Sequence, residues 1–101
     1  MKYKITAQFF KALSHPTRIM IINELLDKRI CVNDIEEILG LKQPNISQHL
    51  SLLRLLNIVD YKKDGNKKCY FINNKDLIRD ILKIVKKIEE EEGENKNAMD
   101  R

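Results

Sequence analysis

Residues 33–73, NDIEEILGLKQPNISQHLSLLRLLNIVDYKKDGNKKCYFIN, decide the fold of this chain. The stretch predicts a short helix over 34–39, a tight turn, a longer helix from about Gln43, and then a two-stranded hairpin. Asn33 is expected to cap the first helix with its side chain, and Gly40 to end that helix in the left-handed conformation. The pattern indicates two helices joined by a turn and followed by a hairpin.

The longer helix is expected to have two different faces. Pro44 suits its first turn, where the missing amide has no partner to lose. Ile46, Leu50 and Leu53 recur at helical spacing and predict a buried stripe. The opposite face carries amides, hydroxyls and a guanidinium but no carboxylate: Gln43, Asn45, Ser47, Gln48, Ser51 and Arg54. Such a face suits contact with phosphates, and its amides can bond to base edges, so it predicts a DNA-reading surface.

The hairpin expected after this helix has a basic tip. Asp64-Gly65 is a typical hairpin turn, and the returning strand is expected over 67–72. Four lysines flank the turn, namely Lys62, Lys63, Lys67 and Lys68. The hairpin is therefore expected to be a cationic finger beside the reading helix.

Three blocks together carry a family resemblance. KALSHPTRIMIINELL (11–26), LGLKQPNISQHLSLLR (39–54) and KKDGNKKCYFI (62–72) resemble the ArsR/SmtB family of winged-helix repressors, with the family's spacing between blocks. The resemblance covers about residues 5–90. It implies a winged helix-turn-helix fold, mainly α with a small β-hairpin wing, in which 29–32 form a minor strand beside the returning wing strand.

Helices are also expected outside the decisive stretch, over 3–13, 16–26 and 75–92. The helix over 16–26 is expected to start at the Ser-His-Pro turn, with His15 as a capping residue. The apolar residues expected to face inward are Ile19, Ile22, Leu25 and Leu26 on this helix, and Ile35, Ile38 and Leu39 on the helix over 34–39.

Length and composition indicate one domain. The chain has 101 residues, 43% of them hydrophobic and 34% charged, and a net charge of +4. We expect a DNA-binding and dimerisation domain over 1–92 and a disordered acidic tail over 93–101. The lack of a signal-peptide core or membrane-length apolar run predicts a cytoplasmic protein, and two cysteines provide no secreted-type disulfide framework. The sequence has no phosphate loop or nucleophile constellation, so an enzyme is not expected.

The resemblance assigns two sets of candidate site residues. The candidate DNA contacts are Lys42, Gln43, Asn45, Ser47, Gln48, His49, Arg54, Lys62, Lys63, Asn66, Lys67 and Lys68. The first and last helices are implied to pair across a two-fold axis through Ile5, Phe9, Leu77, Ile81, Ile84, Val85 and Ile88. The expected partner is therefore double-stranded DNA with a palindromic operator, bound by a homodimer.

The metal sites familiar in the family are incomplete in this sequence. Where the thiolate type of site uses a Cys-x-Cys pair, this chain has Cys31-Val32-Asn33, and one thiolate is a poor site for soft metals. The zinc type needs histidines on the last helix, and residues 75–92 contain none. We therefore expect no metal and no cofactor. His49 is expected to contact phosphate or to pack.

Two questions stay open at this point. Cys31 and Cys69 are either small buried hydrophobic residues or, if 30–32 pair with the returning wing strand, a redox pair. The function is either a repressor, or a constitutive regulator without a small-molecule input, or a protein-interaction module on a winged-helix scaffold.

Overall fold

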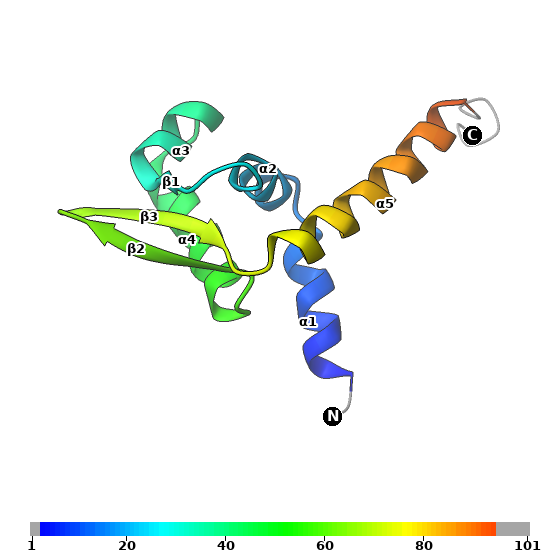
Figure 1. Cartoon of the computed structure of the whole chain (residues 1–101), viewed down its shortest axis with the longest axis horizontal. Helices are drawn as coiled ribbons and strands as arrows, with labels where there is room; N and C mark the ends of the chain where they lie inside the picture. Colours follow the sequence, from blue (N-terminus) through cyan, green and yellow to red (C-terminus); the bar gives the residue numbers. More distant parts are fainter. Residues whose placement is uncertain (1–2, 95–101) are drawn as a thin grey trace.

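The computed structural model describes residues 3–94, which form five helices and one three-stranded sheet (Figure 1). The elements are α1 (Lys4–Leu13), α2 (Pro16–Leu25), β1 (Ile30–Cys31), α3 (Val32–Leu39), α4 (Gln43–Leu55), β2 (Val59–Asp64), β3 (Lys67–Ile72) and α5 (Lys75–Glu94). This order confirms the expected mainly α fold with a β-hairpin wing. The expected acidic tail over 93–101 begins inside α5, and its remaining residues, 95–101, lie outside the described part of the chain.

The sheet has the order β1-β3-β2, so β3 pairs antiparallel with both neighbours. In the hairpin, Asp64 lies opposite Lys67, which leaves Gly65 and Asn66 as the two turn residues. Gly65 has a φ of 64°, a conformation that side-chain-bearing residues rarely adopt, and this explains the glycine in the turn. β1 contributes two residues: Ile30 lies opposite Tyr70, and Cys31 lies opposite Cys69.

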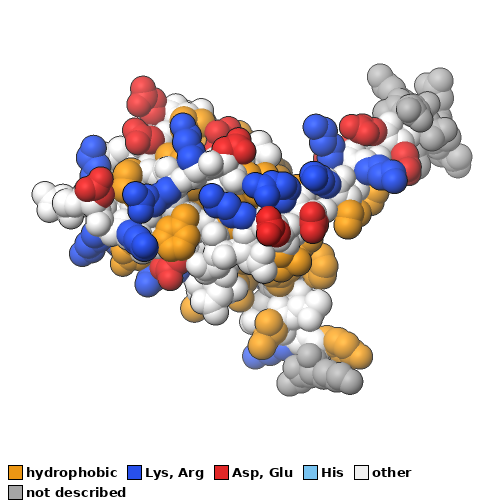
Figure 2. Space-filling view, viewed as in Figure 1, with side chains coloured by type: hydrophobic (Ala, Val, Ile, Leu, Met, Phe, Trp, Pro, Cys, Tyr) orange, Lys and Arg blue, Asp and Glu red, His pale blue; other side chains and the backbone are white. Residues whose placement is uncertain are grey.

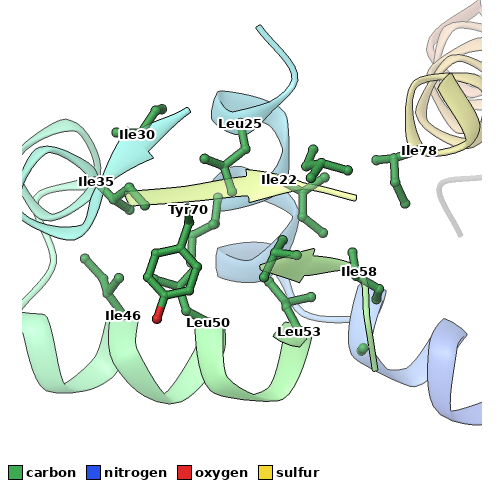
Figure 3. Close-up of a cluster of buried hydrophobic side chains, with 14 residues drawn as sticks. Ile22, Leu25, Ile30, Ile35, Ile46, Leu50, Leu53, Ile58, Tyr70 and Ile78 are labelled. Carbon is green, nitrogen blue, oxygen red and sulfur yellow. The ribbon is translucent and has the colours of Figure 1, made fainter. Parts of the chain in front are cut away.

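The core lies between α2, α4 and the sheet. Figure 3 shows side chains from α2, α4 and β3 converging there, with Ile35 of α3 at one end and Ile78 of α5 at the other. The buried apolar residues of the core are Ala12, Ile21, Ile22, Leu25, Ile30, Ile35, Ile46, Leu50, Leu53, Ile58, Val59, Cys69, Tyr70, Ile72 and Ile78. The buried stripe expected along α4 is therefore confirmed.

Two ends of helices follow the sequence signals closely. His15 precedes α2, and its Nδ1 accepts a hydrogen bond from the backbone N–H of Thr17 at 3.1 Å, as expected for a capping residue. Gly40 ends α3 with a φ of 65°, the left-handed conformation expected there.

Three local expectations were wrong. Asn33 does not cap α3, because the helix begins at Val32 with Cys31 at its N-cap, held there by the pairing of β1 with β3. Ile38 is 47% exposed, since α3 packs through Ile35 and, in part, Leu39 instead. Ile19 is 38% exposed and lines a surface groove between α1, α2 and α5, whereas Ile21 takes the buried position.

Helices α1 and α5 extend away from the body in different directions (Figure 1). The last turn of α1 is fixed to the body, where Arg18 Nε donates a hydrogen bond to the backbone oxygen of Ala12 at 2.6 Å. The first turns of α5 are fixed by buried Ile78 and by Arg79, which donates to the backbone oxygen of Leu26 at 3.3 Å. Across residues 3–94, no helix combines the length and apolar character that crossing a membrane requires.

Two leucines on α4 test this packing. Leu53 is 0% exposed, so Leu53→Ala should lower the free energy of unfolding by about 2–5 kcal/mol through lost burial and a residual cavity. Leu55 is 76% exposed, so Leu55→Ala should change it by less than about 0.5 kcal/mol. Urea unfolding at one fixed protein concentration measures both, and equal effects of the two substitutions would contradict the assigned faces of α4.

Candidate nucleic-acid interface

The polar face of α4 points away from the core. Gln43, Asn45, Gln48 and Ser51 are exposed, and Ser47 is half-buried. Their direction is fixed because Ile46, Leu50 and Leu53 on the opposite face have no exposed surface. The amides and hydroxyls therefore stay available to a partner outside the domain.

A groove of about 440 Å³ joins this helix face to the wing. It is lined by three residues of α4, one helical turn apart, by residues at the hairpin turn and on β3, and by the first two residues of α3. The lining residues are Val32, Asn33, Gln43, Ser47, Ser51, Asn66, Lys67, Lys68 and Tyr70. Helix amides, helix hydroxyls and wing lysines thus face one concave surface.

The wing supplies most of the positive charge near this groove. Lys62, Lys63, Lys67 and Lys68 are all exposed, and Asp64 is the acidic residue beside the hairpin turn. Figure 2 shows basic side chains distributed over the hairpin side of the body, mixed with a smaller number of acidic ones. Such a cluster attracts a polyanion at long range.

Arg54 contacts the wing, a connection that sequence reasoning missed. Its Nε donates to Asp60 Oδ1 at 3.0 Å, and its guanidinium carbon lies 4.5 Å from the ring centroid of Tyr61. Lys68 Nζ lies 4.9 Å from the same ring, which in turn packs against Tyr70. Arg54 therefore links the end of α4 to β2 and β3, and the pairing with Asp60 raises the pKa of its guanidinium.

Asp60 accepts two hydrogen bonds. The backbone N–H of Tyr61 donates to Oδ1 at 2.8 Å, and Arg54 donates to the same atom. The Tyr61 amide, followed by Arg54, holds the pKa of the Asp60 carboxyl below its usual range. No sequence motif marks this arrangement, because it depends on how closely the end of α4 lies to β2.

His49 packs against His15 and is not among the residues that line the groove. The two rings are 4.6 Å apart between centroids. Burial, followed by electrostatic repulsion from nearby His15 and Arg18, lowers the pKa of His49. Within residues 3–94, its buried Nδ1 has no hydrogen-bond partner.

Cys31 and Cys69 form a disulfide. They lie directly opposite each other on β1 and β3, and their Cα atoms are not separated by more than the limit of about 7 Å beyond which two cysteines cannot be bridged. Cys69 is 3% exposed, and Cys31 is half-buried. The sequence allowed two alternatives for these cysteines, separate buried residues or a pair, and the structure has them as a pair.

A search of residues 3–94 for metal ligands gives no group of three or more His, Cys, Asp or Glu side chains suited to holding an ion. The cysteine that remains of the thiolate motif, Cys31, is bonded to Cys69. At the start of α5, Asp76 forms an ion pair with Arg79 at 3.3 Å.

Comparison with known proteins identifies the family. The family model described as bacterial regulatory protein, arsR family, matches residues 15–61. An HTH-type transcriptional regulator of Methanocaldococcus jannaschii is 39% identical over 85 residues, which span 83% of this chain and 94% of that protein. The chain belongs to the ArsR family. The arsenical resistance operon repressor of Staphylococcus xylosus is 33% identical over 84% of each chain.

The fold is likewise that of ArsR-family regulators. The crystal structure of Mycobacterium tuberculosis Rv0081 is similar to this ArsR-family chain with a TM-score of 0.82 and 34% identity, covering 93% of this chain and 94% of that one. The family resemblance drawn from the three sequence blocks is therefore confirmed, and the chain is a transcriptional regulator with a winged helix-turn-helix fold.

The hydrogen bonds of Asp60 generate a pH prediction. Because its folded-state pKa is lowered, the carboxylate stabilises the folded protein at pH values above its unfolded pKa, and this contribution is lost as the pH falls through the folded value. In Arg54→Ala the pKa of Asp60 should rise but stay below the usual range, since the Tyr61 amide still donates. NMR titration of the carboxyl carbon measures both values.

Arg79→Ala provides the matched control, because Arg79 pairs with Asp76 on α5. This substitution should leave the pKa of Asp60 unchanged. An Asp60 carboxyl that titrates in the usual range in the unsubstituted protein would contradict the described contacts.

Proposed function

We propose that this chain is a homodimeric transcriptional repressor that acts in the cytoplasm by binding a palindromic DNA operator, and that its binding responds to thiol oxidation. The observation that supports DNA binding most directly is the shared groove, where Gln43, Ser47 and Ser51 of α4 face Asn66, Lys67 and Lys68 of the wing. Amides and lysines on one surface suit a partner that offers both base edges and phosphates.

The two sides of the groove suit the two parts of a DNA duplex. Amides can donate to and accept from the edge of a base in the major groove, which admits a helix such as α4. Lysines beside them suit phosphate oxygens, which fix the position of a protein on the duplex without reading its sequence. We assign base reading to Gln43, Asn45, Ser47 and Gln48, and phosphate contact to Lys42, Lys62, Lys63, Asn66, Lys67 and Lys68.

The structure changes the role that we propose for two of the candidate DNA contacts, Arg54 and His49. Arg54 is paired with Asp60 and stacked on Tyr61, and we propose that it contacts DNA from this position. The same contacts fix the wing relative to α4. His49 contributes indirectly, because it packs α4 against His15 at the start of α2. Neither residue is proposed to read a base.

Exposed apolar side chains on α1 and α5 support the homodimer. Ile5 is 77% exposed, Phe10 59%, Ile84 63% and Ile88 55%, and Leu77 and Val85 are nearly half exposed. Ile81 is half-buried, and Phe9 packs partly on the domain's own core, so Phe10 is the more available of the two rings. Figure 2 shows apolar side chains along both projecting helices. Phe10 of α1 and Ile81 and Val85 of α5 also line one groove. Exposed apolar surface of this kind marks an interaction site, and we propose a second copy as its partner.

Dimerisation and the palindrome depend on each other. A single copy of α4 contacts too few base pairs for useful specificity. Two copies of α4 related by a two-fold axis can bind two half-sites whose centres are about one helical turn of DNA apart. Repression in particular is proposed because the Staphylococcus xylosus relative is named as a repressor. Constitutive regulation and a protein-interaction module are the alternatives that the following experiments distinguish.

Substitutions in the groove test the DNA-binding role. Against a duplex selected from a random-sequence library, Gln43→Ala or Gln48→Ala should relax base preference, because a bidentate contact contributes about 1–3 kcal/mol of discrimination. Lys67→Ala should weaken binding to all sequences and lower the slope of log affinity against log salt by about one. Fluorescence anisotropy over a salt series measures both effects.

The matched control is Lys87→Ala on α5, which removes the same charge from a helix that does not line the groove. It should leave base preference unchanged. If none of the groove substitutions alters DNA affinity or preference, the interaction-module alternative is favoured.

A charge placed in the apolar stripe of α5 tests the homodimer. Ile84→Glu should shift the protein from dimer to monomer at tens of micromolar, because the side chain is 63% exposed in one copy and becomes a buried carboxylate at the interface. Lys87→Glu changes the charge by more, but Lys87 is exposed, lies outside the stripe and does not line the groove between α1, α2 and α5, so this variant should leave the dimer intact. Sedimentation equilibrium separates the species, and a monomeric unsubstituted chain would exclude the homodimer.

A further inference from the structure

We propose that Cys31 and Cys69 are a reversible oxidation site, and that the disulfide they form holds α4 and the wing in the arrangement that binds DNA. The inference rests on the proposed DNA-binding function and adds the input that regulates it. Dithiol protein is the weak-binding form, and disulfide protein is the tight-binding form.

The position of the two cysteines in the chain supports this role. All twelve candidate DNA contacts, from Lys42 to Lys68, lie between Cys31 and Cys69 in sequence. A bond between the two sulfurs therefore closes a covalent loop, with a sequence separation of 38, that contains α3, α4, β2 and the wing turn. No other part of the described chain is enclosed by this loop, so oxidation acts on the DNA-binding unit itself.

Besides the disulfide, two features hold the ends of this unit together: the pairing of β1 with β3, and the burial of Ile30 and Ile35 in the same core as Tyr70. β1 is two residues long, and its only register partners on β3 are Tyr70, opposite Ile30, and Cys69, opposite Cys31. A pairing this short contributes little order by itself. The covalent bond therefore adds, to the short pairing and the core packing, a direct constraint between the start of α3 and Cys69 on β3.

Both cysteines adjoin the groove. Val32 and Asn33 directly follow Cys31, and Lys67 and Lys68 directly precede Cys69, and all four line the groove between α4 and the wing. The disulfide thus joins two walls of the same surface. In the bonded form these walls already have the arrangement in which helix amides and wing lysines face one partner. Reduction removes the covalent connection between these walls, and binding then has to restore the order that the bond provided.

The exposures of the two thiols indicate the order of the chemistry. Cys31 is half-buried and Cys69 is 3% exposed, so an oxidant reaches Cys31 first. With a hydroperoxide, the Cys31 thiolate attacks one peroxide oxygen, the O–O bond breaks, and an alcohol leaves with the proton, giving a sulfenic acid on Cys31. The Cys69 sulfur then attacks the Cys31 sulfur, the S–O bond breaks, and water leaves with the Cys69 proton.

The overall reaction is balanced. Two thiols and one hydroperoxide give one disulfide, one alcohol and one water, with two electrons passing from the sulfurs to the O–O bond. Two equivalents of a small thiol reverse it by thiol–disulfide exchange, which restores both protein thiols and forms the small disulfide.

The experiment compares the two forms of the full-length protein. Protein treated with hydrogen peroxide or with dithiothreitol is checked for free thiols and for the intact mass, where disulfide formation removes two hydrogen atoms. Each form is then titrated onto a duplex selected from a random-sequence library, with the selection carried out separately on both forms, and onto a scrambled duplex. The disulfide form should bind the selected duplex at least about fivefold more tightly than the dithiol form.

Two variants make the assignment specific. Cys31→Ser changes a half-buried residue and should bind DNA like the dithiol form, with an affinity that peroxide no longer alters. Cys69→Ala fills a buried position with an apolar side chain and should behave in the same way. Far-ultraviolet circular dichroism and urea unfolding confirm that each variant is folded before its affinity is compared.

The possible results separate this inference from the function on which it rests. If neither form prefers the selected duplex over the scrambled one, sequence-specific DNA binding is itself wrong. If binding is specific but the two forms bind equally, or the dithiol form binds more tightly, the proposed switch is overturned. A peroxide effect that survives in Cys31→Ser would also overturn it, because the sulfur responsible would lie elsewhere.

Discussion

Burial of one face of α4 fixes the direction of the other. Ile46, Leu50 and Leu53 have no exposed surface, so rotating this helix about its axis would bring amides and hydroxyls into an apolar core. Burying one such group without a partner costs about 1–3 kcal/mol, and several would be buried together. The outward direction of the polar face is therefore a consequence of core packing. The groove, the lysines of the wing and the contact of Arg54 with Asp60 all take their places relative to this helix.

Local chemistry made much of the fold predictable. Gly40 and Gly65 occupy left-handed positions where the sequence indicated turns, Pro44 lies in the first turn of α4, and His15 caps α2. Each of these signals depends on the residue itself and its near neighbours in the chain. The three-block spacing then supplied the connection between elements, which periodicity alone does not provide. The polar face of α4 could be predicted for the same reason, since its members recur at helical spacing.

Contacts between distant segments explain what the sequence did not reveal. Asn33 has the chemistry of a cap, but pairing of β1 with β3 places Cys31 at that position instead. Arg54 was assigned to DNA by its place on the helix, whereas its pairing with Asp60 depends on the path of the chain after α4. Asp60 and Tyr61 were missed for the same reason. The sequence predicted the approach of Cys31 to Cys69 only as one of two alternatives. Their pairing depends on the register of β1 against β3, and a shift of one residue would point the two side chains to opposite faces of the sheet.

The sheet also has a consequence for the order in which the chain folds. β2 and β3 are joined by a two-residue turn, so their pairing closes a very short loop, whereas β1 must find β3 across 38 residues. Loop-closure entropy favours the short connection, and non-local pairing is rewarded only after the intervening helices are in place. Chain entropy therefore favours forming the hairpin before β1 pairs with β3. We expect Ile30 and Cys31 to complete the sheet last, after α3 and α4 have formed.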